Sequence, residues 1–535
     1  MPRSVEASSG ARCLLEPGRR QRALPIRLAA AAGSVALTMT LLPARTLTVD
    51  DDGPADYRLI QNAIDAALAG DQVAVAAGTY SENLSLKSGV AVVGAGSSVT
   101  IIDGGRRASV ARLFDCDAGT RLEGFRLTGG QAGTGGGVRI DGGSPVVRFN
   151  EIVGNLASPG SAYSYSYGGG VAVLHSGATV SSNILSTNDA DYGGGLHVEG
   201  GAPRVIRNLI TGNTAGAGGG VDAYVLPGTD AVFAANTITS NSAKFGGGLE
   251  LGGYGVPVLI NNVIVGNTAV ASGSGTGLGG GADAYFSNPL MINNTLDRNA
   301  ARTGGGASIL TQGAPRIVNN IFLDNRASNT GGAMDLESPG VQVLNNLFYL
   351  NARGTCSGST ASSCSEPSNL ETDPILVDPS GSDFRPLAGS PAIDSALGAE
   401  APPDDARGQR RPLDGDRDGV AAPDRGAYEY DRNEVPGLEL SGGSAGSSRL
   451  AWQPVSGAVA YHVYSVLFSG HLSRLPDSCR DADDVDPADR SFPETLVPPS
   501  GQAFAYLVTA VIAVGEQSAG FDSLGLERTL PVPCP

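Results

Sequence analysis

Ionisable residues recur at one position of a repeated pattern in this sequence. The second residue after a run of glycines is Asp222, Glu250 and Asp283 in three consecutive repeats. Two carboxyl groups about 5–10 Å apart can hydrolyse a glycosidic bond, one as an acid and the other as a base or nucleophile. Grouped carboxylate oxygens can also hold Ca²⁺. These three residues are therefore the catalytic candidates if the protein is an enzyme.

Further polar and aromatic residues share this repeat position or the position two residues later. Aromatic rings there can stack on sugar rings. The predicted substrate-binding residues are His197, Glu199, Tyr224, Tyr285, Asp335 and Glu337. Among the residues at these positions only Arg139 and His197 are basic, so elimination on uronates is poorly supported without Ca²⁺. The alternative is that this row of charges covers the solvent face of a sheet and prevents edge association.

The elements that position this row follow from an asparagine period. Asparagines five residues apart occur eight times, from Asn150 and Asn155 to Asn346 and Asn351, about every 28 residues. The third residue before the first asparagine and the second residue after it are apolar in all eight repeats. Short apolar strands separated by glycine and asparagine turns predict β-structure. Such repeats must stack, which predicts a parallel β-solenoid with inward ladders of structural asparagines.

The region before the repeats predicts a cap. Ile60, Ala63, Ile64 and Ala67 form one apolar face of a helix. A helix here can cover the open end of a solenoid, which would otherwise expose core and strand edges.

The segment TLTVDDDGPADYRLIQNAIDAALAGDQVAVAAGTYSENLSLKSGVAVVGAG, residues 46–96, resembles the start of right-handed parallel β-helix proteins of the pectin-lyase-like superfamily. The glycine and asparagine repeats also resemble those of surface β-helix proteins such as polymorphic outer-membrane proteins. The resemblance covers about residues 46–350. It implies a right-handed parallel β-helix and, in the enzymes of the superfamily, an active site on an outward strand face. The superfamily contains several enzyme classes and non-enzymes, so the resemblance implies no particular reaction.

The next segment, residues 352–434, contains strings such as Ser390–Asp394 and Asp424–Glu429. They resemble the choice-of-anchor Q domain, which implies a C-terminal cap and association with a cell surface. Within it, Asp414, Asp416 and Asp418 precede Gly419 as in the first half of a calcium loop. Arg425 occupies the place of the usual bidentate glutamate, so Asp424 or Glu429 would have to replace it. An acidic, solvated turn is the alternative to calcium.

Residues 435–535 form short apolar strands with turn signals. This part resembles a fibronectin type III β-sandwich, with Trp452 in the core and Tyr506 as a tyrosine-corner candidate.

The N-terminus predicts export. Residues 1–44 contain six arginines and two acidic residues, and residues 28–42 are an apolar run too short to span a bilayer. We read residues 1–44 as a signal peptide and expect no transmembrane segment in the mature chain. In an oxidising compartment, disulfides are expected for two pairs, Cys356 with Cys364 and Cys479 with Cys534. The net charge of −17 argues against a nucleic-acid partner.

The expected domains are a signal peptide (1–44), a right-handed parallel β-helix (45–351), a C-terminal cap (352–434) and a β-sandwich (435–535). The first functional hypothesis is an exported, monomeric protein that presents its acidic strand face to polysaccharide or to another cell-surface partner. The second is a polysaccharide-degrading enzyme, either a glycoside hydrolase or a calcium-dependent lyase, acting on the same face. The sequence favours the first, because no family catalytic motif is present.

Overall fold

The computed structural model describes residues 44–159, 165–271, 277–416 and 418–431, together with seven strands of the C-terminal part. Residues 1–43 of the predicted signal peptide lie outside the described residues, as do Trp452 and Cys534. Cys479 and Tyr506 lie in strands whose side chains are not described.

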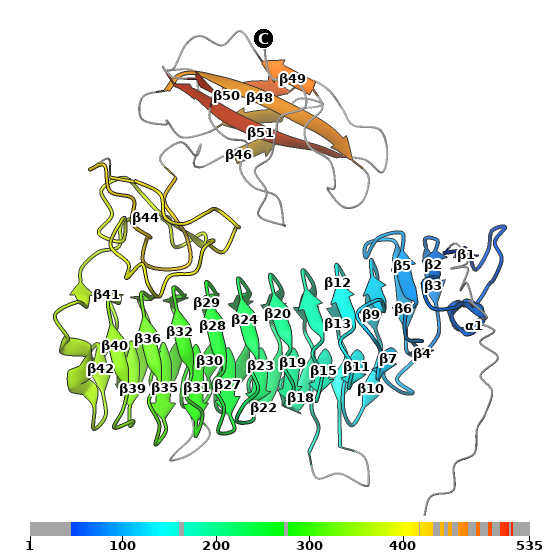
Figure 1. Ribbon diagram of the computed structural model, residues 1–535, viewed down its shortest axis with the longest axis horizontal. Coiled ribbons are helices and arrows are strands. Elements are labelled where there is room, and N and C mark those ends of the chain that lie inside the picture. The colour runs from blue at the N-terminus through cyan, green and yellow to red at the C-terminus, as the bar shows by residue number, and fades with distance from the viewer. Residues whose placement is uncertain are drawn as a thin grey trace, which may run out of the picture. The chain divides into compact units, whose positions relative to one another are not determined.

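Residues 46–371 form a parallel β-solenoid whose strands stack into four sheets along the long axis (Figure 1). A coil passes in turn through sheet C, sheet A and sheet B, and from residue 131 to residue 330 also through sheet D. The site lies on sheet C, which consists of β4 (Leu84–Ser85), β7 (Ala111–Phe114), β11 (Val138–Asp141), β15 (Val171–Leu174), β19 (Leu196–Glu199), β23 (Val221–Tyr224), β27 (Leu249–Gly252), β31 (Ala282–Tyr285), β35 (Ala307–Leu310), β39 (Met334–Leu336) and β42 (Cys356–Ser357).

The other three sheets close the coil around the core. Sheet A consists of β1 (Thr46–Val49), β2 (Gln72–Val75), β5 (Ala91–Gly94), β8 (Arg121–Glu123), β12 (Val146–Arg148), β16 (Thr179–Ser181), β20 (Arg204–Ile206), β24 (Val232–Ala234), β28 (Val258–Ile260), β32 (Leu290–Ile292), β36 (Arg316–Val318) and β40 (Gln342–Leu344). Sheet B consists of β3 (Gly78–Tyr80), β6 (Thr100–Asp103), β9 (Arg126–Thr128), β13 (Glu151–Val153), β17 (Ile184–Ser186), β21 (Leu209–Thr211), β25 (Thr237–Thr239), β29 (Val263–Val265), β33 (Thr295–Asp297), β37 (Ile321–Leu323), β41 (Leu347–Tyr349) and β43 (Leu370–Glu371). Sheet D consists of β10 (Gln131–Ala132), β14 (Leu156–Ala157), β18 (Asp189–Tyr192), β22 (Thr214–Ala217), β26 (Ser242–Ala243), β30 (Thr268–Ala269), β34 (Ala300–Thr303) and β38 (Arg326–Thr330).

Buried asparagines hold two corners of the coils from residue 150 onward, as the sequence predicts. The first asparagine of each pair lies between sheets A and B, and the second between sheets B and D. Asn241, for example, accepts hydrogen bonds from the backbone N and the Nδ2 of Asn213, both over 3.0 Å. Its own Nδ2 donates to the Ile210 carbonyl over 2.9 Å and to Asn267 Oδ1 over 3.0 Å. The two ladders therefore satisfy corner groups that the sheets leave unpaired.

A short helix covers the N-terminal end of the core (Figure 1). Helix α1 (Ile60–Ala66) buries Ile60, Ala63 and Ile64 on the side facing the solenoid. Its first two amides donate to the carboxylate of Glu82, over 2.8 Å at Ile60 and 3.0 Å at Gln61. Since a negative charge at a helix N-terminus is favourable, this contact fixes the predicted cap.

The segment after the solenoid packs on the outer surface of sheet B. Phe384 and Ala427 share a buried apolar cluster with Val265, Leu323 and Leu347 of that sheet. Four outer asparagines also hold the segment by donating to its backbone carbonyls: Asn261 to Asp404, Asn293 to Asp424, Asn319 to Leu397 and Asn345 to Ser395. The segment also contains the hairpin of β44 (Leu376–Asp378) and β45 (Asp383–Pro386) and is preceded by the 3₁₀ helix η1 (Ala361–Ser365).

The C-terminal strands form two antiparallel sheets. One contains β46 (Glu439–Gly442), β47 (Ser448–Ala451) and β50 (Ser491–Glu494), and the other contains β49 (Ser478–Asp481), β48 (Ala458–Phe468), β51 (Ala503–Ile512) and β52 (Gly515–Glu516). Two antiparallel sheets fit the expected β-sandwich. No helix in the described residues is long and apolar enough to cross a membrane.

Candidate functional site

The predicted row of polar residues forms a continuous column across sheet C. Strand pairing places His197, Asp222, Glu250 and Asp283 side by side on β19, β23, β27 and β31, and Ser308 follows on β35. Adjacent parallel strands lie about 4.8 Å apart. The column points away from the core, yet His197, Asp222 and Asp283 are only 2%, 6% and 4% exposed. The row therefore does not merely cover a solvent face, because other side chains exclude water from it.

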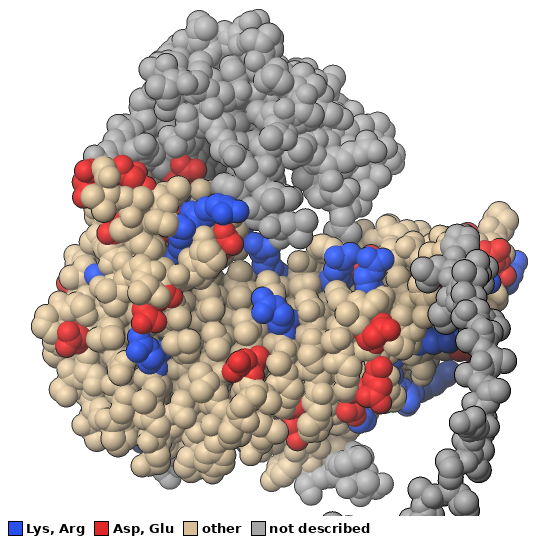
Figure 2. All heavy atoms as spheres, in the orientation of Figure 1, with Lys and Arg blue, Asp and Glu red and all other residues tan. Residues whose placement is uncertain are grey.

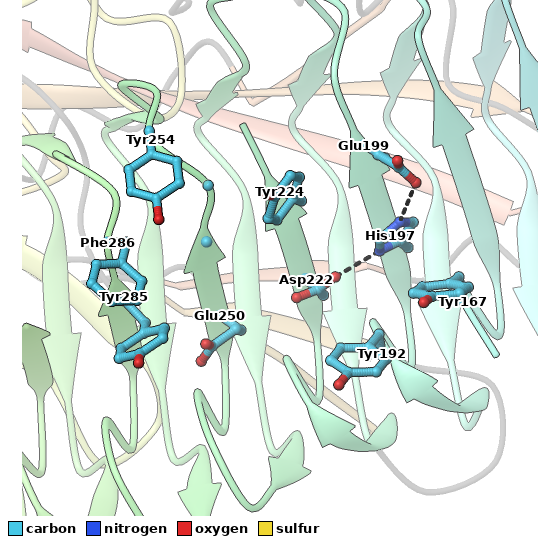
Figure 3. A pocket seen from close by; sticks show the side chains of 12 residues that line it. Tyr167, Tyr192, His197, Glu199, Asp222, Tyr224, Glu250, Tyr254, Tyr285 and Phe286 are labelled. Atoms are coloured by element: carbon cyan, nitrogen blue, oxygen red, sulfur yellow. Dashed lines mark hydrogen bonds and ion pairs between the residues drawn. The ribbon is translucent and has the colours of Figure 1, made fainter. Parts of the chain in front are cut away.

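At one end of the column His197 forms a buried ion pair. His197 Nδ1 donates to Asp222 Oδ2 over 2.6 Å, and Nε2 lies 3.9 Å from Glu199 Oε2 (Figure 3). Burial lowers the pKa of His197, but the hydrogen bond to Asp222 and the negative charges of Asp222 and Glu199 outweigh it and raise the pKa to about 8. The contact with His197 likewise lowers the pKa of Glu199. His197 is thus a cation at neutral pH, held between two carboxylates.

This ion pair should make stability depend on pH. The folded-state pKa of His197 lies above its ordinary value of 6.5, so the stabilisation is fully present below pH 6.5 and is lost as the pH rises through 8. The pair should contribute about 2 kcal/mol. The test compares urea unfolding of the wild type and His197→Asn at about pH 6 and pH 9. The wild-type advantage should shrink at the higher pH, whereas the exposed His175→Asn should show no such change. An advantage that grows with pH would contradict the ion pair.

In the middle of the column two carboxyl groups share a proton. Glu250 and Asp283 are hydrogen-bonded neighbours, and Glu250 Oε2 is buried with no partner. Burial, followed by the charges of Asp283 and Asp222, raises the pKa of Glu250 well above its ordinary value. Burial also raises the pKa of Asp283 to about 6, although its hydrogen bonds to Ser308 and Glu250 oppose the shift. At neutral pH Glu250 is therefore the protonated member and Asp283 the ionised one.

Aromatic side chains wall a cleft of about 420 Å³ above Asp222 and Glu250. On the side of His197, Tyr167 and Tyr192 stack with ring centroids 5.4 Å apart, and Tyr167 lies 4.9 Å from the His197 ring. On the side of Glu250 stand Tyr254 and Phe286, stacked at 5.7 Å (Figure 3). The predicted Tyr224 and Tyr285 complete this wall of the cleft.

Four aromatic residues that line the cleft were not predicted from the sequence: Tyr167, Tyr192, Tyr254 and Phe286. A signal for two of them was present, because Tyr167 and Tyr192 each directly precede a glycine run. Parallel pairing joins them in one column next to sheet C. Tyr254 and Phe286 come from the loops that leave β27 and β31, and these loops follow no repeat.

Gly252 opens a gap in the tyrosine row. It lines the cleft and pairs with Tyr224, on the same strand as Glu250. A Cβ atom at Gly252 would meet only Tyr224 Cδ2, at 3.5 Å, which is ordinary van der Waals contact. The backbone therefore tolerates a side chain here, and the glycine leaves space between the rings of Tyr224 and Tyr285.

Filling this gap should block the cleft without unfolding the protein. Gly252→Leu is expected to weaken binding of any ligand that enters the cleft by at least about tenfold, because the leucine occupies space above Glu250. Gly252→Ala is the matched control, with a smaller effect. Binding is measured by titration calorimetry and folding by the melting temperature. Unchanged affinity in a folded leucine variant would show that the ligand does not enter the gap.

Two predicted binding residues lie outside this cleft. Asp335 lies on β39, the next strand of sheet C beyond Ser308, and Glu337 directly follows this strand. Ser357 Oγ donates to Asp335 over 2.5 Å, and Ser359 Oγ donates to Glu337 over 2.6 Å. The structure therefore does not bring them together with His197, Glu199, Tyr224 and Tyr285.

Two of the three predicted calcium ligands, Asp414 and Asp416, lie close to Asp394, which the sequence pattern did not include. One carboxylate oxygen from each of Asp394, Asp414 and Asp416 lies within 4.8 Å of the other two. Asp418 instead accepts the Val420 amide over 2.7 Å. Glu429 accepts the amides of Leu413 and Asp424, so its oxygens are used within the fold. Acidic side chains gather on this segment, at the upper left of Figure 2.

One of the two expected disulfides is present. Cys356 and Cys364 are bonded, whereas Cys116 is a buried free thiol. The pairing of Cys479 with Cys534 falls on residues whose side chains are not described.

Comparison with known proteins identifies the fold. Residues 210–369 match the family model "Right handed beta helix region". Residues 46–371 form a right-handed parallel β-helix. It is similar in structure to pectate lyase Pel9A, at 16% identity and a TM-score of 0.46 over 73% of this chain and 98% of that chain. It is also similar to the PL6 family alginate lyase AlyGC, at 14% identity and a TM-score of 0.31 over 65% and 58% of the two chains.

A pectin methylesterase from carrot is a further similar structure, at 11% identity and a TM-score of 0.24 over 63% of this β-helix chain and 90% of that chain. These likenesses concern the fold alone and assign no residue a role. Comparison with curated proteins found no match. The predicted β-helix is thus confirmed, whereas the choice-of-anchor Q and fibronectin type III resemblances stay predictions.

Proposed function

We propose that this β-helix protein is a glycoside hydrolase that cleaves polysaccharide in the sheet C cleft. The observation that carries the proposal is that Glu250, on the floor of a cleft walled by aromatic rings, lies between two carboxyl groups, those of Asp222 and the buried Asp283. A carboxyl group kept protonated at neutral pH, beside one kept ionised, is the arrangement that glycosidic bond cleavage needs. Of the two functions that the sequence leaves open, the cleft favours the enzyme.

In this proposal Glu250 is the general acid. It donates its proton to the leaving glycosidic oxygen while the bond from that oxygen to the anomeric carbon breaks. Asp283 takes part by holding the proton on Glu250 until substrate binds. Asp222, the carboxylate on the other side of Glu250, attacks the anomeric carbon. A water molecule then displaces it and gives a proton back to Glu250. His197 positions Asp222 by donating a hydrogen bond to its Oδ2 over 2.6 Å.

The strand spacing favours retention of configuration. Asp222 and Glu250 lie on adjacent strands, about 4.8 Å apart, close to the carboxyl separation of about 5–5.5 Å in retaining glycosidases. The first product should therefore keep the anomeric configuration of the substrate, which proton NMR of fresh digests can follow. An inverted first product would contradict Asp222 as the nucleophile.

The deciding experiment is a cleavage assay of the mature chain on a polysaccharide panel, with reducing ends and ultraviolet absorbance followed together. New reducing ends without absorbance are expected, because hydrolysis creates no double bond. Absorbance would instead identify elimination, the lyase alternative. Binding without any product would return the protein to the first sequence hypothesis, a glycan-binding protein.

Export and calcium are supported by separate observations. We propose that the protein is exported, since the bonded Cys356 and Cys364 suit an oxidising compartment. Oxygens of Asp394, Asp414 and Asp416 are close enough to share one Ca²⁺. Thermal unfolding with added CaCl₂ tests this proposal: the melting temperature should rise in the wild type but not in Asp394→Asn.

A further inference from the structure

The charges around the cleft are almost all negative. Glu199 and Asp283 are ionised at neutral pH, Glu250 is neutral, and Asp222 accepts the hydrogen bond of the His197 cation. None of the described residues that line the cleft is lysine or arginine. The chain has two lysines, Lys87 and Lys244, and neither is among the lining residues.

The single cation of the cleft is already neutralised. His197 directs Nδ1 at Asp222, over 2.6 Å, and Nε2 at Glu199, over 3.9 Å. The nearest arginine of the same column, Arg139, lies two strands from His197 on β11 and pairs with Asp141 over 2.9 Å, and Arg112 lies one strand further away on β7. No described cation is therefore placed to receive a negative group of a ligand above Glu250.

Two buried polar atoms of the floor lack hydrogen-bond partners. They are His197 Nε2, a donor in the protonated ring, and Glu250 Oε2. A sugar hydroxyl can both donate and accept, so hydroxyls can satisfy both atoms. An ionised carboxylate only accepts, and it would lie about one strand spacing, about 5 Å, from Asp222 and Asp283.

We propose that the cleft binds an uncharged sugar, rather than a uronate, at the position above Glu250. This proposal rests on the proposed function, for which it names the substrate class. The aromatic walls supply apolar faces for the sugar ring, the two unpartnered atoms bind its hydroxyls, and the surrounding carboxylates repel acidic polymers.

The test measures how tightly the full chain carrying Glu250→Gln, which slows turnover, binds a set of polysaccharides. The neutral probes are laminarin, arabinoxylan, galactomannan and fully methyl-esterified polygalacturonate, and the acidic probes are polygalacturonate and alginate. At least one neutral polymer should bind at least about tenfold more tightly than either acidic one. Its affinity should change little between about 0.05 M and 0.5 M NaCl, whereas weak binding of an acidic polymer should improve as salt screens the repulsion.

The variant Glu199→Gln tests separately whether the carboxylates of the cleft repel acidic polymers. Removing this carboxylate should raise the affinity for polygalacturonate relative to the neutral polymer several-fold, and the control Glu151→Gln on sheet B should not. Equal or tighter binding of an acidic polymer, or binding of none of the probes, would overturn the inference. The proposed hydrolase function is tested separately with the wild type. Cleavage of any probe supports that function. Binding of a neutral probe without cleavage would overturn the hydrolase function and leave the preference for an uncharged sugar standing.

Discussion

Replacing Glu250 by glutamine should lower the rate of glycan cleavage by about 10²- to 10⁴-fold, the range that a general acid contributes. Glutamine has nearly the same shape and can still hydrogen-bond to Asp283, but it has no proton to give to a leaving oxygen. The fold should be kept, because the variant replaces a buried neutral acid by a neutral amide. The measurement is the rate of reducing-end release at saturating polymer.

A matched control separates the acid from a general effect of charge. Glu151→Gln changes a glutamate on sheet B that pairs with Arg126 on the surface, over 3.0 Å. Its rate should equal that of the wild type. Full activity in Glu250→Gln would remove Glu250 from the mechanism. If a substrate with an activated leaving group, which needs no proton, is cleaved at a nearly wild-type rate, the role of acid is supported directly.

Replacing Asn241 by alanine should destabilise the solenoid by about 3–5 kcal/mol. The substitution removes the acceptor of the Asn213 amide and the donor to the Ile210 carbonyl, in a corner where Asn241 is only 1% exposed. Water cannot reach these groups, so each bears the cost of an unmade hydrogen bond. Urea unfolding followed by circular dichroism measures the loss.

Asn351, at the end of the same asparagine ladder, is the control position for Asn241. Asn351 accepts the Asn325 amide over 3.1 Å but lies in a partly exposed corner. Asn351→Ala should therefore cost less, about 1–2 kcal/mol, because water replaces part of the lost bonding. Equal losses at the two positions would mean that burial does not govern the strength of the ladder. Coils contact only their neighbours, so both variants are compared on the same unfolding transition.

The docking of the C-terminal segment had a sequence signal that the asparagine period concealed. Asn261, Asn293, Asn319 and Asn345 each directly precede a ladder asparagine, and the four coils before them carry Phe149, Ser182, Arg207 and Ala235 at this place. The doubled asparagines mark the coils that the segment covers. Each takes a positive φ, near 54° to 59°, and turns its amide outward to the segment. A period alone cannot reveal this, because an exposed turn and a covered turn share the same backbone.

The amino-acid sequence by itself determined the solenoid and the order of the column on sheet C. Each coil pairs only with its neighbours, so the spacing from glycine run to asparagine sets the register of every strand. His197, Asp222, Glu250 and Asp283 are therefore adjacent as the spacing requires. Tertiary structure alone decided that this column is a buried cleft with a neutral Glu250 and a charged His197. Proton affinity depends on groups within a few ångströms, and here these groups come from other coils and from loops of irregular length.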